Sequence, residues 1–220
     1  MDTVSKPWDW NQNTLELWRE PAEEAYYLLV RWQKANFHTF LDLGCGLGRH
    51  AYLFAEHGFS VQAFDLSEEA VQEVREGAAH RHLDIITSFG DMMKLPYPEA
   101  HFDCLLAYHV ISHSDTAGLE AILREIRRVL KPGGEFFLTL CSKTAWIYRD
   151  SGYPKLDENT VVSQEEGPEF GVPHFCCDEP LLKKLFAKDQ VINLRHSQDL
   201  AIFGREFHHS WHYFLLGKKP

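Results

Sequence analysis

Residues 41–50, LDLGCGLGRH, place three glycines directly after a short apolar run. Gly44, Gly46 and Gly48 permit positive φ angles and let backbone N–H groups approach a bound ligand closely. An apolar strand that ends in such a turn and continues into a helix is typical of a nucleotide-binding site. A glycine turn with a purely structural purpose is the alternative that this pattern leaves open.

The spacing of the glycines argues against a dinucleotide. The dinucleotide fingerprint is G-x-G-x-x-G, but Arg49 occupies the position of its third glycine here. A bulky side chain at that position would prevent the close packing of helix on strand that a dinucleotide site uses. The turn also lacks the Lys-Ser/Thr pair of a P-loop. An NAD-dependent oxidoreductase is therefore the weakest of the functions considered.

Two more acidic residues follow the next two apolar stretches. Asp65 closes VQAFDL and lies 21 residues after Gly44, where a carboxylate can accept hydrogen bonds from ribose hydroxyls. Asp91 follows DIITSFG, where it could accept from the amine of an adenine while Met92 lies against the ring. The alternatives are a neighbour of the next helix's N-cap for Asp65 and an ordinary turn for Asp91.

Alternating helices and strands are expected to position these residues. Hydrophobic periodicity and turn residues predict helices over 14–35, 49–58, 67–80, 119–130 and 180–189, and strands over 37–44, 59–66, 84–91, 101–110, 135–140, 191–200 and 205–219. Ser67 is the expected N-cap of the third helix, and the segment KPGG is expected to stop the fourth. This alternation predicts an α/β fold with a doubly wound, mostly parallel sheet, which binds its ligands at the carboxyl ends of the strands.

The length of 220 residues suits a single domain, 1–220. We expect residues 1–37 to form an N-terminal helical cap. Residues 142–178, rich in Pro, Gly, Glu and aromatic side chains, are expected to form an insertion or lid over the site.

The composition of the chain restricts which partners and which location we expect. A net charge of -10 disfavours nucleic acid, and the longest apolar runs are too short to span a membrane. The first residues do not resemble a signal peptide, and five cysteines without a framework spacing favour a reducing, cytoplasmic location. The sheet edge near the last two strands suggests a homodimer.

Together these motifs resemble class I S-adenosylmethionine (SAM)-dependent methyltransferases of the methyltransferase domain 11/25 group. The matching segments are LDLGCGLGRH, FDLS, GDM, FDCLLAYHV and LREIRRVLKPGGEFFLTL, within residues 38–141. The resemblance implies a seven-stranded sheet whose last strand is antiparallel, with SAM as the cofactor. It implies that the residues near SAM are Gly44, Cys45, Gly46 and Gly48 at the methionine part, Asp65, Leu66, Asp91 and Met92 at the ribose and adenine, and Tyr108 on the methyl side. We place Asp42 and Arg49, at the two ends of the glycine turn, in the same set.

A base is needed only if the methyl acceptor carries a proton at neutral pH. His109 and His113 follow the fourth strand, in LLAYHVISH, and a histidine has a suitable pKa. They would share a face if that stretch were helical. The alternative is that both histidines only pack in a loop.

Aromatic residues near the N-terminus have two interpretations. Trp8, Trp10, Trp18 and Tyr26 could cover the SAM pocket, where an aromatic face attracts a sulfonium. For Tyr27 and Trp32 we favour packing of the helix on the sheet, and Trp18 fits both interpretations. We include Trp18 among the candidate substrate contacts.

The segment VPHFCCDE contributes His174 as a second candidate substrate contact. His174, Cys176 and Cys177 do not have the spacing of a zinc site, so we predict no metal. In HHSWH, His208 and His212 would share one face of a strand and His209 would lie on the other. That alternation argues against a single three-histidine site.

The run after the fourth strand also bears on the acceptor. It is Ala107-Tyr108-His109-Val110, without the Asn/Asp-Pro-Pro-Tyr run of methyltransferases that modify base or glutamine amines. A small-molecule acceptor is therefore the leading hypothesis. A SAM-binding module without catalysis is the alternative from another class.

Overall fold

The computed structural model describes residues 5–10, 16–203 and 206–220. Its strands are β1 (Thr39–Leu43), β2 (Ser60–Asp65), β3 (Ile85–Phe89), β4 (Phe102–Ala107), β5 (Leu130–Ser142), β6 (Lys155–Asp157), β7 (Thr160–Val162), β8 (Pro173–Cys177), β9 (Gln190–Phe203) and β10 (Glu206–Lys218). Its helices are the 3₁₀ helix η2 (Glu16–Arg19), α1 (Glu23–Lys34), α2 (Arg49–Glu56), α3 (Glu68–Arg81), α4 (Thr116–Val129), α5 (Trp146–Arg149) and α6 (Glu179–Leu185).

The main sheet has the predicted form. Its strand order is β3-β2-β1-β4-β5-β10-β9, in which β1 to β5 run parallel and β10 is antiparallel to both β5 and β9. This confirms a doubly wound, mostly parallel sheet of seven strands with an antiparallel last strand. Three more strands of the 142–178 segment, in the order β8-β7-β6, extend the sheet from the end of β5.

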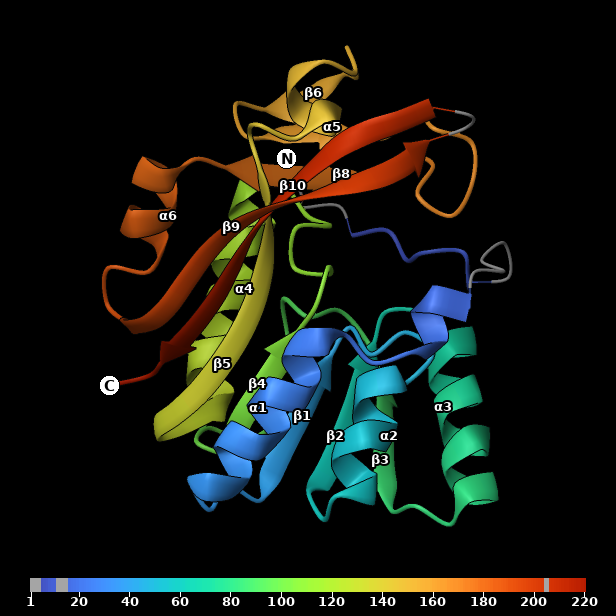
Figure 1. The fold of residues 1–220 in the computed structure, drawn as a ribbon, viewed down its shortest axis with the longest axis vertical. Coiled ribbons are helices and arrows are strands. Elements are labelled where there is room, and N and C mark those ends of the chain that lie inside the picture. The colour runs from blue at the N-terminus through green and yellow to red at the C-terminus, as the bar shows by residue number, and fades with distance from the viewer. Residues whose placement is uncertain (1–4, 11–15, 204–205) are drawn as a thin grey trace.

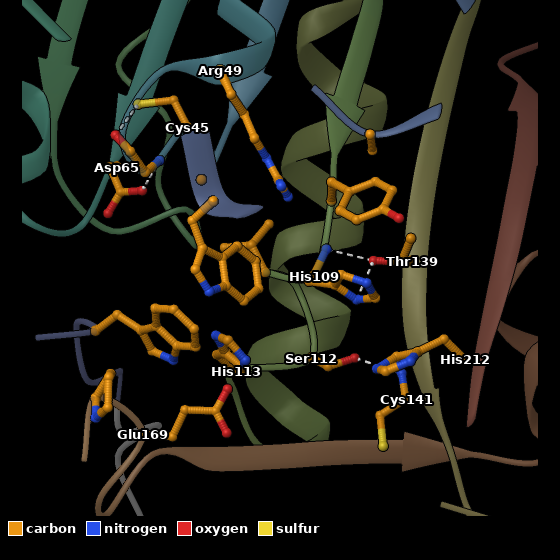
Figure 2. Close-up of a pocket in the computed structure, with 18 of the residues that line it drawn as sticks. Cys45, Arg49, Asp65, His109, Ser112, His113, Thr139, Cys141, Glu169 and His212 are labelled. Atoms are coloured by element: carbon orange, nitrogen blue, oxygen red, sulfur yellow. Dashed lines mark hydrogen bonds between the residues drawn. The ribbon is translucent and has the colours of Figure 1, made fainter. Parts of the chain in front are cut away.

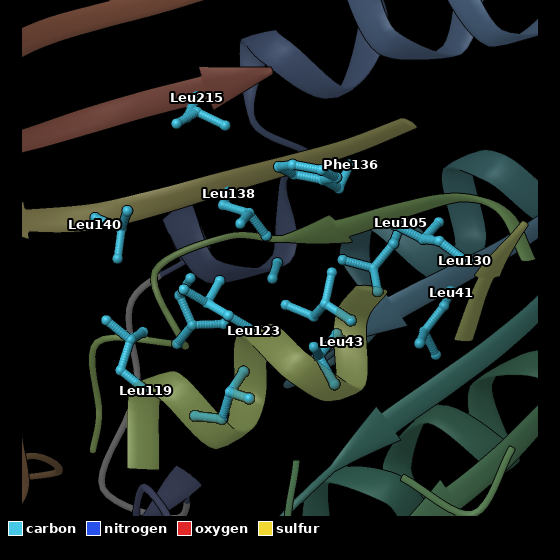
Figure 3. Packing of buried hydrophobic residues seen from close by; sticks show 14 of the residues in the cluster. Leu41, Leu43, Leu105, Leu119, Leu123, Leu130, Phe136, Leu138, Leu140 and Leu215 are labelled. Carbon is cyan, nitrogen blue, oxygen red and sulfur yellow. The ribbon is translucent and has the colours of Figure 1, made fainter. Parts of the chain in front are cut away.

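Helices cover both faces of the sheet (Figure 1). On one face, α1, α2 and α3 bury a cluster that includes Trp32, Phe40 and Phe54. On the other, α4 and α6 pack against the sheet, and Figure 3 shows the α4 leucines facing β1, β4 and β5. The buried positions of α4 are Leu119, Ile122, Leu123 and Ile126, the spacing of a helix with one apolar face.

The N-cap of α3 and the end of α4 were predicted correctly, but the start of α4 was not. Ser67 caps α3 as predicted, because its side chain accepts from the backbone N–H of Ala70. The helix predicted over 119–130 begins earlier, at Thr116, where Asp115 accepts from the N–H of Gly118. The KPGG segment follows the end of that helix as predicted, since α4 ends at Val129, and residues 131–134 form the first part of β5.

The N-terminal region differs from the single helix predicted over 14–35. The structure has a 3₁₀ turn, η2, and then α1, with Pro21 between them, and residues 11–15 lie outside the described part of the chain. Trp32 packs in the core as predicted. The prediction that Tyr27 does the same is wrong, since 58% of Tyr27 is exposed.

The 142–178 segment was expected to be irregular, but it contains α5, β6, β7 and β8. Strand β5 extends beyond β4, whose last residue pairs with Leu138. Strand β8 pairs with this extension at Cys141 and Ser142. As a result the insertion lies beyond the carboxyl ends of the central strands (Figure 1).

Within the described residues, no helix has the length and apolar character needed to cross a membrane.

Asp103 connects the starts of β1 and β4 to Lys131. Its carboxylate accepts from the backbone N–H groups of His38 and Thr39, both at 2.9 Å, and from Lys131 Nζ at 2.8 Å. Burial raises the pKa of Asp103, but the hydrogen bonds from Lys131, His38 and Thr39 outweigh it and hold the pKa well below its usual value. The ionised form is therefore stabilised by folding.

We predict that Asp103→Asn lowers the free energy of unfolding by about 1.5–3 kcal/mol at pH 7, as expected for hydrogen bonds to a charged group. Because the folded pKa is depressed, this contribution is present above the unfolded value of about 4 and is lost as pH falls toward the folded value. Urea unfolding of both proteins between pH 7 and pH 3 should show the difference shrinking with acid. A difference that stays constant with pH, or one matched by the exposed-site variant Asp84→Asn, would contradict the assignment.

Candidate functional site

The glycine turn joins β1 to α2 at the carboxyl edge of the sheet. Gly44, Gly46 and Gly48 have φ angles of 72°, 49° and 82°, in the left-handed region that favours glycine. A Cβ on Gly44 would lie 2.3 Å from a methyl of Val110, and one on Gly46 would lie 2.5 Å from the ring of Trp10. The two glycines are thus required both by the backbone conformation and by close neighbours.

Asp65 links this turn to the end of β2. Its carboxylate accepts from the N–H of Gly46 at 2.8 Å (Figure 2). It also accepts from the N–H of Ser67 at 2.9 Å. Burial raises the pKa of Asp65, and the N–H donors of Ser67, Gly46 and Leu66 oppose that rise. The carboxylate oxygens have further lone pairs, and Asp65 lines the adjacent cavity.

The cavity has a volume of about 1180 Å³ and reaches from the glycine turn to the 142–178 insertion. Most residues predicted for the site line it: Gly44, Cys45, Gly46, Arg49, Asp65, Leu66, Met92, Tyr108, His109, His113, Trp18 and His174. The spacing of residues in the sequence therefore predicted many of the residues that line the cavity.

Three predicted cofactor residues do not line the cavity. Asp42 is buried behind the turn and accepts from the N–H of Ala51, with its pKa raised to about 7 by burial. Gly48 packs near Val74 and Tyr52. Asp91 accepts from the N–H of Met93 within its own turn. In the structure these residues support the turns instead of facing the cavity.

Aromatic side chains cover the glycine turn. The rings of Trp10 and Trp18 lie 5.1 Å from that of Trp8, and the Arg49 guanidinium lies 5.1 Å from the Trp18 ring and 5.4 Å from that of Tyr108. Trp18, which the sequence allowed in either environment, is therefore part of the cavity wall. The ring faces of Trp18 and Tyr108 and the positive charge of Arg49 therefore lie beside the glycine turn.

His109 lines the cavity, two residues after the end of β4. Its backbone is left-handed, with φ 53°, and its N–H donates to Thr139 Oγ1 at 2.5 Å. The His212 ring lies 4.4 Å from the His109 ring (Figure 2). Burial, followed by the charges of His212 and Arg49, lowers the pKa of His109 well below its usual value. The imidazole is therefore neutral at pH 7 and can accept a proton.

His113 lies in a separate part of the cavity, because residues 110–114 form turns instead of a helix. Its ring lies 4.9 Å from that of His174, and the ring of Trp8 stacks on it at 6.2 Å. Glu169 Oε2 is 3.5 Å from His174 Nε2. Burial lowers the pKa of both His113 and His174 to about 4.

Two residues of this site were not found from the sequence as members of it. Glu169 lies in the irregular part of the insertion, and no local pattern distinguishes it. His212 lies on β10, opposite Cys141 of β5. The alternation predicted for HHSWH is present in the structure. The ring of His208 stacks on that of Trp146, with 4.0 Å between them. His209 is exposed beside Gln198, and of these three histidines only His212 approaches His109.

The chain is similar in sequence to known methyltransferases. Residues 40–134 match the sequence profile of a methyltransferase domain. The sterol 24-C-methyltransferase of Kluyveromyces lactis is 32% identical over 155 residues, which cover 69% of this chain and 40% of that protein. The malonyl-[acyl-carrier protein] O-methyltransferase of Erwinia pyrifoliae is 37% identical over 168 residues, or 72% of this chain and 60% of that protein. The chain thus spans 40% and 60% of the length of these two relatives.

The fold comparison agrees. A SAM-dependent methyltransferase from Methanosarcina mazei superposes with a TM-score of 0.69 and 20% identity, covering 82% of this chain and 92% of that one. Its likeness supports the fold alone, whereas the glycine turn, the acid at the end of β2 and the matched profile support the family. On these grounds the chain belongs to the class I SAM-dependent methyltransferases.

Proposed function

We propose that this protein transfers the methyl group of SAM to a small-molecule acceptor held under the 142–178 insertion. The observation that carries the proposal is a single cavity of about 1180 Å³ that begins at the glycine turn and ends at the insertion. Sites for one drug-sized ligand have volumes of roughly 300–1000 Å³. The cavity therefore has room for SAM and an acceptor together.

The residues at the glycine turn fit SAM. The Asp65 carboxylate can accept from ribose hydroxyls, and Leu66 and Met92 offer apolar contact to an adenine ring. The Arg49 guanidinium suits the carboxylate of the methionine part, and the faces of Trp18 and Tyr108 suit a sulfonium. When bound, SAM supplies an already activated methyl group.

The protein's own contribution is to hold, orient and deprotonate the acceptor. The turn and the aromatic wall fix one partner, and the insertion encloses the other and excludes water. His109 is neutral and can accept the proton that the acceptor loses as its atom gains the methyl. Thr139, which accepts from the His109 N–H, keeps that residue in place.

An acceptor atom that carries a proton at neutral pH, such as the oxygen of a hydroxyl group, suits this arrangement best. The two relatives named above are a C- and an O-methyltransferase, so their names do not fix the atom. The run Ala107-Tyr108-His109-Val110 offers no Asn/Asp-Pro-Pro-Tyr cradle for an amine.

We also propose a single domain with residues 142–178 as the lid, acting in the cytoplasm without nucleic-acid or membrane partners. All five cysteines are buried free thiols, which suits a reducing compartment. The outer edge of β9, which pairs only with β10 among the described strands, is the surface that we propose for a homodimer.

The test of this function is methyl transfer itself. The purified protein would be incubated with methyl-labelled SAM and a panel of small phenols, carboxylic acids and acyl thioesters. Acceptor-dependent transfer of the label, together with formation of S-adenosylhomocysteine, is the expected result. Tight binding of S-adenosylhomocysteine without transfer to any acceptor class would instead support the non-catalytic SAM-binding module.

A further inference from the structure

Three side chains with metal-ligand chemistry meet at the insertion end of the cavity. His113 comes from the loop after β4, Glu169 from the turn before β8, and His174 from β8 itself. One ligand atom from each lies within 4.8 Å of the others. Figure 2 shows His113 and Glu169 directed toward each other.

One nitrogen of this group has no hydrogen-bond partner in the part of the chain that the structure describes. His174 is only 6% exposed, and its Nε2 is buried without a hydrogen-bond partner among the described residues. The nearest carboxylate oxygen, Glu169 Oε2, is 3.5 Å away, longer than a good hydrogen bond. A buried nitrogen without a partner destabilises the folded state, and a bound cation would remove that penalty.

Neighbouring contacts hold the three residues in place. The N–H of Phe175, next to His174, donates to the carbonyl of Ser112, next to His113, at 2.7 Å. This bond ties β8 directly to the loop after β4. The ring of Trp8 also stacks on that of His113. The cluster is therefore built by packing between segments far apart in the sequence.

The donor set points to a class of metal. Two imidazoles and one carboxylate, without a thiolate, suit a divalent first-row transition ion such as Zn²⁺ or Fe²⁺. Three protein ligands leave coordination positions open, as in catalytic metal sites and unlike the closed sites of structural zinc. All three residues line the cavity, so the open positions would face its interior.

We propose that His113, Glu169 and His174 bind one divalent transition-metal ion whose open positions take an oxygen ligand in the cavity. The site goes beyond the proposed methyl transfer, and metal binding does not depend on it. Only the identity of the oxygen ligand, an oxygen of the methyl acceptor, rests on the proposed function. The prediction of no metal considered only Cys176 and Cys177 as partners of His174, and those thiols are not members of this group.

The test uses the full chain, prepared without a polyhistidine tag and stripped with a chelator. Zn²⁺ would be titrated in competition with a chromophoric chelator, and Co²⁺ would be added separately to record its absorption spectrum. We expect one Zn²⁺ per chain and a Co²⁺ spectrum of nitrogen and oxygen ligation. Glu169→Gln and His174→Ala should each weaken binding by about 100-fold or more, since the loss of a mere supporting partner costs about 10–100-fold.

Two matched controls define the result. His209→Ala removes an exposed histidine elsewhere, and Cys177→Ala removes the nearby thiol, so both should bind Zn²⁺ as the wild type does. Failure of the folded wild type to bind one equivalent, or loss of binding in either control but not in Glu169→Gln, would overturn the site. Binding of S-adenosylhomocysteine, measured on every variant, separates the two proposals. If the protein does not bind S-adenosylhomocysteine, the proposed function is wrong, but the conclusion about Zn²⁺ binding still stands.

Discussion

Replacing Asp65 by alanine is expected to abolish measurable binding of S-adenosylhomocysteine. The Asp65 carboxylate holds the N–H groups of Gly46 and Ser67, so the substitution frees both turns at the cofactor end of the cavity. It also removes the acceptor proposed for the ribose hydroxyls. Each hydrogen bond to a charged group contributes about 1.5–3 kcal/mol. The loss of two such bonds weakens binding by roughly 100-fold or more.

Isothermal titration calorimetry of wild type and variant would measure this loss directly. Asp65→Asn keeps the volume and one acceptor oxygen, so it should bind with intermediate affinity and guard against misfolding of the alanine variant. The control is Asp84→Ala, which removes an exposed carboxylate just before β3. Wild-type affinity in a folded Asp65→Ala protein would show that the cofactor does not lie at this end of the cavity.

The second large effect is expected for His109→Asn. General-base catalysis contributes about 10²–10⁴-fold, so kcat should fall by that factor while the KM for SAM stays near its wild-type value. Asparagine is the apt replacement because it tolerates the left-handed backbone, φ 53°, of this position. Steady-state kinetics with the acceptor found in the transfer assay would measure the change.

The direction of the His109 pKa shift predicts how the activity changes with pH. The pKa of His109 lies well below its ordinary value of about 6.5, so the base is already unprotonated at neutral pH. Wild-type activity should therefore stay level from pH 8 to about 6.5 and fall only at lower pH. His209→Asn, at an exposed position of β10, should behave as wild type. An unchanged kcat in His109→Asn would remove His109 from the proposed chemistry.

The cofactor half of the site could be predicted from sequence because it follows local rules. In a parallel sheet all carboxyl ends meet at one edge, so the glycine turn after β1, Asp65 at the end of β2 and Tyr108 after β4 had to converge. The same rule could not tell which side chains face the cavity. Asp42 and Asp91 form hydrogen bonds with their own neighbours instead, since nearby N–H groups were available to them.

The sequence by itself determined the alternation of strands and helices, the left-handed glycine turn and the family, because each depends on residues close together in the chain. Only the tertiary structure decided how Glu169, His174 and His212 join His109 and His113. Their placement depends on β10 pairing along β5 and on β8 pairing with the part of β5 that extends past β4. Such pairing depends on which strand edges remain open after the sheet forms, and no local spacing of residues records that.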